Sequence, residues 1–217
     1  MVRATWAALL LAGITTQLWA GQIGVTIVDP KGKPVEDAVV VAEAGSTSAA
    51  RGEDGTPKLA DQGAPTATVT QINMRFEPYV TVVPVGARIN FPNKDNVLHN
   101  VYSFSKAKTF ELPLYRDRPS EPVVFEKSGV VILGCNIHDW MVAYVYVVDT
   151  PFFAKTDSTG RATLRGLPDG DYDVQVWHPR KKKRGSSPKK RIHLDSDGTV
   201  QTEFVVGLKP EWRPQAP

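Results

Sequence analysis

Hydrophobic and polar residues alternate along most of the chain with the two-residue period of a β-strand, and short clusters of Gly, Pro, Asn and Asp separate the alternating runs. No run has the wider spacing that is typical of an amphipathic helix. We therefore expect an all-β protein. The expected strands are 22–28, 35–42, 67–72, 76–83, 88–91, 99–104, 123–125, 130–133, 141–148, two within 154–164, 172–178, 191–194 and 200–206.

Turn and loop residues between these runs predict how the strands connect. The Pro- and Gly-containing turn at 29–34 predicts a hairpin that joins the first two strands. Asp197 and Gly198 predict another hairpin, between the last two strands. The stretch 105–122, with three prolines, predicts a polar connection, and the Gly-, Ser-, Ala- and Pro-rich stretch 45–65 predicts a linker or loop.

The N-terminus has the pattern of a secretory signal peptide at residues 1–20. Arg3 precedes a short apolar run from Trp6 to Ala12, and small residues near Ala20 offer a cleavage site. The alternative is an uncleaved membrane anchor, but the run is short for a transmembrane helix, and no later stretch has the length to span a bilayer. We therefore expect an exported, periplasmic protein.

Three side chains that bind soft or borderline metals lie within seven consecutive positions: Cys135, His138 and Met141, spaced Cys-x2-His-x2-Met. Two histidines and one cysteine with a weak axial methionine form the arrangement of a blue copper site. Such a site needs a second histidine, and His99 is the candidate among the four histidines of the chain. The alternative interpretation is a buried cysteine, a hydrogen-bonded histidine and a core methionine without a metal.

The chain contains a single cysteine, so it cannot form an internal disulfide. A free exposed thiol outside the cytosol is prone to oxidation. Metal ligation deprotonates and protects the sulfur, and it therefore gives a reason for one cysteine in an exported protein.

The formal charge of +3 is unevenly distributed. Residues 66–149 carry eight basic and eight acidic side chains, whereas residues 150–217 carry thirteen basic and eight acidic ones. Most of this surplus lies between positions 180 and 191. Such a basic loop is typically solvated, but it could dock an acidic protein partner or an anionic membrane face. Export argues against a nucleic-acid partner.

Residues 66–149 resemble a cupredoxin, the small Greek-key sandwich domain of blue copper proteins. The stretch 82–93, followed by His-Asn at 99–100, is similar to the strand that leads into the first histidine ligand of this family. The Cys-x2-His-x2-Met motif is similar to the C-terminal ligand loop of the family, and its short His-to-Met spacing is similar to that of the amicyanin branch.

The resemblance implies one type 1 copper per chain, with His99, Cys135 and His138 as equatorial ligands and Met141 as the axial ligand. Asn100 resembles the asparagine that ties the first-ligand strand to the cysteine loop in this family. We expect its side chain to hold that loop in place, the alternative being an ordinary turn residue.

The sequence departs from the amicyanin branch at Asp139 and Trp140, which occupy the positions between the histidine and the methionine of the motif. A carboxylate there could change the copper potential and the choice of partner. Trp140 either enlarges an exposed apolar patch around a solvent-facing His138 or packs inward, and the sequence leaves both alternatives open.

Residues 21–62 and 150–208 together resemble a carboxypeptidase-regulatory-like, prealbumin-like (transthyretin-like) β-sandwich. The resemblance is carried by the stretches 27–40, 156–162 and 167–172. Each piece is too small to close a core by itself, so we expect two β-sandwiches, with the cupredoxin inserted into a loop of the other sandwich. The end of the chain, 209–217, is expected to be a flexible tail.

These resemblances imply a periplasmic electron carrier that is not an enzyme and that meets redox proteins, such as a cytochrome or a dehydrogenase, in transient contacts. Copper binding and delivery is one alternative, and a scaffold protein without electron transfer is another. A copper oxidase or nitrite reductase is disfavoured because few histidines remain for a second copper centre.

Overall fold

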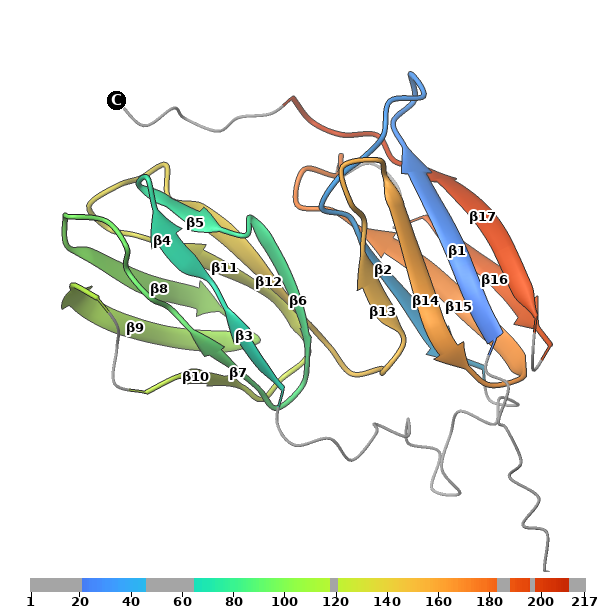
Figure 1. Ribbon diagram of the computed structural model, residues 1–217, viewed down its shortest axis with the longest axis horizontal. Coiled ribbons are helices and arrows are strands. Elements are labelled where there is room, and N and C mark those ends of the chain that lie inside the picture. Colours follow the sequence, from blue (N-terminus) through green and yellow to red (C-terminus); the bar gives the residue numbers. More distant parts are fainter. Residues whose placement is uncertain (1–20, 46–64, 118–120, 183–187, 196–197, 211–217) are drawn as a thin grey trace, which may run out of the picture.

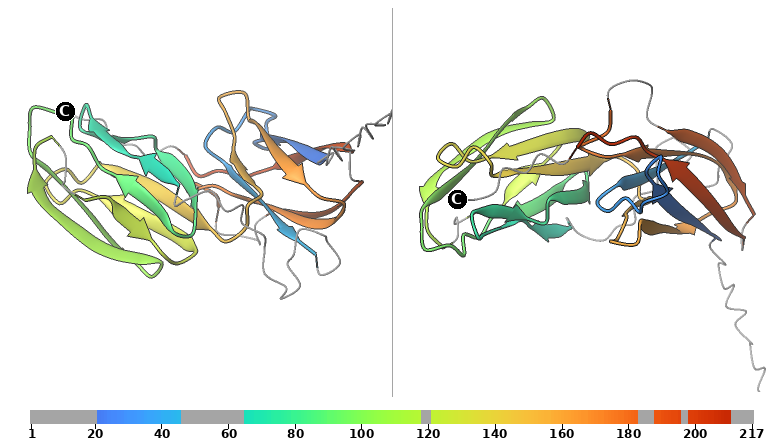
Figure 2. Two further views of the ribbon diagram at one scale, coloured as in Figure 1. Left: turned by 60° about the horizontal axis from the view of Figure 1, so that its bottom comes forward. Right: turned by 90° about the horizontal axis from the view of Figure 1, so that it is seen from above.

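The computed structural model describes residues 21–45, 65–117, 121–182, 188–195 and 198–210, and every regular element in these ranges is a β-strand. The strands form two β-sandwiches that lie side by side (Figure 1, Figure 2). The expectation of an all-β fold with two sandwiches is therefore confirmed. Within the described ranges, no helix has the length and apolar character needed to cross a membrane. The predicted signal peptide and the centre of the basic loop, 183–187, lie outside the described residues.

The first two and the last five strands form one sandwich, which we call the host sandwich. Its strands are β1 (Gly21–Val28), β2 (Val39–Ala44), β13 (Phe153–Lys155), β14 (Arg161–Leu167), β15 (Gly170–Trp177), β16 (Lys189–Leu194) and β17 (Thr199–Val205). One sheet has the order β14-β1-β17 and the other has the order β13-β2-β15-β16. Because β1 pairs antiparallel with β14 and parallel with β17, strands from both ends of the chain share one sheet.

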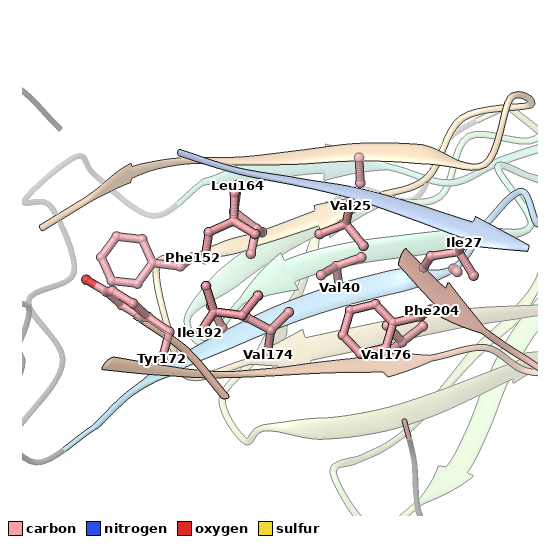
Figure 3. Packing of buried hydrophobic residues seen from close by; sticks show 14 of the residues in the cluster. Val25, Ile27, Val40, Phe152, Leu164, Tyr172, Val174, Val176, Ile192 and Phe204 are labelled. Carbon is pink, nitrogen blue, oxygen red and sulfur yellow. The ribbon is translucent and has the colours of Figure 1, made fainter. Parts of the chain in front are cut away.

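The core of the host sandwich follows from the alternation of its strands. In β15, Tyr172, Val174 and Val176 are buried, whereas the intervening Asp173 and Gln175 remain half-exposed. The buried set meets side chains of the facing sheet, such as Val25, Leu164 and Phe204 (Figure 3). Burying a Val or Leu side chain contributes about 1.5–3 kcal/mol. This layer, which consists only of residues of the host sandwich, therefore stabilises that sandwich.

The strands between β2 and β13 in the chain form the second sandwich, which we call the middle sandwich. Its strands are β3 (Thr66–Thr68), β4 (Thr70–Ile72), β5 (Arg75–Glu77), β6 (Val80–Pro84), β7 (Ala87–Asn90), β8 (His99–Ser105), β9 (Lys108–Tyr115), β10 (Val123–Phe125), β11 (Gly129–Gly134) and β12 (Val142–Val148). A sheet of order β6-β12-β11-β8-β9 faces a smaller one of order β10-β7-β3, and β4 and β5 form a hairpin. The core of this sandwich includes Cys135 and Met141.

Neither predicted hairpin of the host sandwich extends along its strands. β1 and β2 lie in opposite sheets, and antiparallel pairing across the turn at 29–34 is limited to the bridge between Val28 and Pro34. β16 and β17 also lie in opposite sheets. The turn residues between them therefore carry the chain from one sheet to the other. A turn signal shows where a strand ends, but long-range pairing decides which strand becomes its neighbour.

Three further predictions in the middle sandwich need correction. The stretch predicted as a polar connection contains β9, which pairs with β8 along the edge of the larger sheet. Its side chains alternate between half-buried and exposed positions from Lys108 to Pro113, but none is fully buried, and the prolines of the stretch favoured a connection over a strand. The single strand predicted at 67–72 is divided into β3 and β4, which lie in different sheets. The single strand predicted at 76–83 is divided into β5 and β6 around Pro78, whose peptide bond with Glu77 is cis.

The two sandwiches meet through an apolar and aromatic contact that we call the joint. It comprises Val39, Val41, Phe153 and Trp177 of the host sandwich and Tyr79, Val80, Val82, Tyr144, Tyr146 and Val148 of the middle sandwich. The rings of Tyr146 and Trp177 stack with centroids 5.2 Å apart at 17°. Lys155 Nζ donates to Asp37 Oδ1 at 2.7 Å and also to the carbonyl of Val80 at 3.0 Å, and so connects the sandwiches by a polar link.

Candidate metal centre

Three potential metal-binding atoms converge at one end of the middle sandwich. Nδ1 of His99 lies 3.1 Å from Nδ1 of His138, and Sγ of Cys135 lies 4.0 Å and 3.9 Å from these two nitrogens. Metal–nitrogen and metal–sulfur bonds of roughly 2.0–2.3 Å place three ligands of one ion roughly 3.3–3.8 Å apart. The spacing of the three atoms therefore fits a single small ion between them.

The three residues lie at or near the ends of strands, which restricts their positions. His99 begins β8 and is fully buried, with 0% of its surface exposed. Cys135 directly follows β11 and is 2% exposed, and His138 lies three residues later, half-buried, in the loop before β12. Because the larger sheet holds these strand ends side by side, it brings residue 99 to residues 135 and 138.

The loop between β11 and β12 is short and closed on itself. The backbone N–H of Met141 donates to the carbonyl of His138 at 2.8 Å and makes a tight turn of residues 138–141. Met141 is 1% exposed and belongs to the same core cluster as Cys135. Asn100 Oδ1 accepts a hydrogen bond from the N–H of Asn136 at 2.8 Å, so the Asn100 side chain connects β8 to this loop.

The second ring nitrogen of His99 has a partner that the sequence did not reveal. His99 Nε2 lies 2.8 Å from Oδ2 of Asp95, whose side chain is 13% exposed. A carboxylate accepts from an N–H, so this contact favours the tautomer protonated at Nε2 and leaves the Nδ1 lone pair directed at Cys135. The only available signal was the spacing of an acidic residue four positions before the predicted histidine ligand.

Asp95 also holds the turn between β4 and β5. Its Oδ1 accepts from the N–H of Asn73 at 2.6 Å and its Oδ2 from the N–H of Met74 at 2.9 Å. Both turn residues have positive φ, 53° and 51°, which is the conformation of a tight hairpin turn. One carboxylate thus joins this hairpin to the candidate ligand His99.

Trp140 follows the inward alternative. It is half-buried and packs against the core of the middle sandwich, and its Nε1 donates to the carbonyl of Met74 at 3.2 Å. Its ring lies 5.2 Å from that of His138. Exposed apolar side chains nevertheless adjoin the candidate ligands, because Leu98 is 41% exposed and Ile137 is 49% exposed.

The electrostatics of the cluster favour neutral imidazole and ionised carboxylate. Burial lowers the pKa of His138, and the nearby His99 lowers it further. Burial alone would raise the pKa of Asp95, but hydrogen bonds from Met74, His99 and Asn73 outweigh it and hold this pKa below its ordinary value. A neutral imidazole is the form that binds a metal, so the lowered pKa of His138 favours metal binding.

The chemistry of these donors suits copper. Thiolate and imidazole together favour copper or zinc over the hard cations, and a buried thioether beside them adds a soft, weak donor. The carboxylate of Asp95 is occupied by hydrogen bonds, which leaves one sulfur and two nitrogens for the ion. The residues present therefore fit a copper ion, with His99, Cys135 and His138 able to hold it.

A second group of potential ligands lies in the host sandwich but differs in character. Asp169, His193 and Asp195 have ligand atoms close together, and all three are exposed. The ring of His193 is engaged with Asp171 at 2.9 Å, and this hydrogen bond raises the pKa of the histidine. His178 is buried, and its Nδ1 accepts from the N–H of Arg180 at 3.1 Å. These contacts agree with packing and surface roles for His178 and His193.

No protein-family model matches the chain, and no curated protein matches it. Solved structures of copper proteins match part of it. A purple cupredoxin from Nitrosopumilus maritimus is 26% identical, over 38% of this chain and 99% of that chain, with a TM-score of 0.34. A reduced Cu(I) form of an amicyanin mutant is 22% identical, over 42% of this chain and 87% of that chain, with a TM-score of 0.35. A copper-containing nitrite reductase from Thermus scotoductus is 22% identical, over 57% of this chain and 28% of that chain, with a TM-score of 0.37.

Proposed function

We propose that this chain is an exported type 1 copper protein of the cupredoxin class that carries single electrons between redox proteins. The observation that supports it is the convergence of Cys135 Sγ with the Nδ1 atoms of His99 and His138 in a largely buried position. Met141 is the proposed axial ligand. Its place in the same core cluster as Cys135 supports this role.

Copper bound here would supply one-electron chemistry between Cu(I) and Cu(II). The protein contributes a ligand set that moves little. Asp95 orients the His99 ring, Asn100 fixes the loop at Asn136, and the Met141–His138 hydrogen bond closes that loop. Because hydrogen bonds within the protein fix these ligands, each change of charge at the site would require little rearrangement.

Electrons would enter and leave at the edge of the site where His138 is half-exposed. The exposed apolar side chains of Val97, Leu98 and Ile137 adjoin the two histidines in the sequence and lie at this end of the sandwich. A small apolar patch suits a weak, transient encounter between redox proteins. We propose a cytochrome or a dehydrogenase as the partner and no catalytic reaction at the site itself.

The proposal is tested by the colour of the copper-loaded protein. Protein without the predicted signal peptide, residues 1–20, is expected to show the intense absorption of a copper–thiolate bond when it is loaded with Cu(II). Cys135→Ser removes the only thiol of the chain and is expected to abolish this absorption, whereas Met141→Leu keeps it and changes the reduction potential. A colourless copper complex of the intact protein would contradict a type 1 site.

Copper delivery is the second candidate, and the partial exposure of His138 favours it, since an accessible ligand can exchange metal. Voltammetry and chelator competition separate the two functions. A carrier is expected to give a reversible one-electron wave and to keep its copper against a strong Cu(I) chelator. Rapid loss of Cu(I) to the chelator would favour delivery.

A further inference from the structure

A cavity of about 640 Å³ lies on the host sandwich beside Tyr79 of the middle sandwich. Three host segments line most of it: the turn after β1, residues 29–37; the segment after β15, residues 178–182; and the segment after β17, residues 207–210. Its volume lies within the usual range of roughly 300–1,000 Å³ for small-molecule sites, which often occur where domains meet.

Positively charged side chains dominate this cavity. They are Lys31, Lys33, Arg180, Lys182 and Lys209. The last three are placed by backbone pairing, because the N–H of Lys182 donates to Gly207 O at 2.9 Å and the N–H of Lys209 donates to Arg180 O at 2.8 Å. These bonds flank an antiparallel bridge between Lys181 and Leu208. Alternate residues of such a pair share one face, which brings the three cations to the same side.

The carboxylates of the cavity are mostly engaged within the protein. Asp37 pairs with Lys155, which is not a lining residue, at 2.7 Å. Asp29 Oδ1 accepts from the backbone N–H groups of Lys33 and Lys31, at 2.9 and 2.8 Å, and these bonds lower its pKa. Glu36 is the third lining carboxylate. The lining thus has two more positive than negative charges, and Lys155 also offsets Asp37.

Basic residues elsewhere on the host sandwich differ from those of the cavity. Lys189 Nζ lies 3.1 Å from Asp173, and Arg191 Nε lies 3.4 Å from the same carboxylate. Their charge is therefore partly neutralised on a strand, and neither residue lines the cavity. The two sets make a matched comparison between basic residues that line the cavity and basic residues that do not.

We propose that this cavity binds a small multivalent anion that carries phosphate or carboxylate groups. Lysines supply point charges, and Arg180, whose Nε donates to the carbonyl of Lys209 at 3.2 Å, adds the charge of a guanidinium. A multivalent anion would offset the surplus charge on three host segments at once and would hold them against the middle sandwich at Tyr79. This site is separate from the candidate metal centre and does not depend on copper.

The test is isothermal titration calorimetry at low ionic strength, with pyrophosphate and citrate as probes. The titrated protein is the whole chain without the predicted signal peptide, residues 1–20. Lys182→Gln with Lys209→Gln is expected to weaken binding by about tenfold or more, since it removes two of the charges that would contact the anion. The control, Lys189→Gln with Arg191→Gln, removes the same charge outside the cavity and is expected to change affinity less than about twofold. Circular dichroism and thermal unfolding verify that both variants fold.

The two probes also distinguish the source of the anion, because tighter binding of pyrophosphate indicates a phosphate ligand and tighter binding of citrate a polycarboxylate. The proposal is overturned if neither probe binds, or if both double variants lose affinity equally, since that indicates general charge attraction. Binding to vesicles containing phosphatidylglycerol, without binding of either soluble probe, would instead indicate a membrane surface and would also overturn it.

Discussion

At the scale of single residues, Asp95 shows how much one half-buried side chain can organise. Its two oxygens accept from Asn73, Met74 and His99, so a hairpin turn and a candidate metal ligand share one carboxylate. Partners of this kind orient metal ligands and tune their basicity, and their loss commonly costs 10–100-fold in affinity or activity. Asp95 is thus a positioning residue for the proposed site.

Asp95→Asn is expected to weaken copper binding by about 10–100-fold. Asparagine has one acceptor oxygen, so it can replace Oδ1 or Oδ2 but not both, and its NH2 group would face either the N–H of Asn73 or the N–H groups of Met74 and His99. The measurement is a competition titration with chelators of known affinity. Asp139→Asn is the control, because Asp139 is an exposed carboxylate beside His138, and it is expected to alter affinity little. Equal effects of both variants would show that net charge, rather than orientation of His99, matters.

At the scale of elements, the turns of the host sandwich decide how its strands cross between sheets. Gly160, between β13 and β14, has φ of +74°, and a Cβ on it would lie 2.5 Å from the carbonyl of Ile27. Gly32, after β1, has φ of +78° but nothing within 4 Å of its Cβ position. The two glycines therefore separate the effect of backbone conformation from that of close packing.

Gly32→Ala is expected to destabilise the protein by roughly 1–2 kcal/mol, the cost of a left-handed residue with a Cβ. Gly160→Ala is expected to cost roughly 2–4 kcal/mol, because overpacking against the Ile27 backbone adds to that cost. Urea unfolding of the two variants measures the difference in the free energy of unfolding. Equal losses would mean that β1 can move away from the turn.

At the scale of the whole molecule, the joint determines whether the two sandwiches behave as one body. The ring of Trp177 stacks on Tyr146 and lies 5.9 Å from that of Tyr144, both on β12. Since β12 begins directly after Met141, one strand extends from the candidate metal loop to the host sandwich (Figure 1). Rigid packing at the joint would hold the proposed copper site in a constant orientation relative to the host.

Trp177→Ala is expected to remove about 2 kcal/mol or more from the contact between the sandwiches. Their unfolding should then separate into two transitions in differential scanning calorimetry. Phe104→Ala is the control, because Phe104 is an aromatic residue of the middle sandwich that is 78% exposed and lies outside the joint cluster. An unchanged single transition for Trp177→Ala would show that the sandwiches are coupled by other contacts.

The sequence predicted local features well where the physical cause is local. A two-residue alternation directly reflects burial of one strand face, so most strands and the all-β class were predicted, whereas the exposed edge strand β9 was missed. The spacing of Cys135, His138 and Met141 places potential ligands on one loop because the residues are neighbours in the chain. The copper ligand set and the domain boundaries remain predictions, although His99 does lie beside Cys135.

Tertiary structure decided what neighbours the strands and side chains would have. The parallel pairing of β1 with β17 joins segments from opposite ends of the chain, and no turn signal between adjacent strands encodes it. The contacts of Asp95 likewise depend on three chain segments that meet only in the folded sandwich. By itself the sequence determined an all-β chain with a metal-binding motif on one loop. Only the fold decided which strands pair and which groups orient that motif, because these interactions arise between residues distant along the chain.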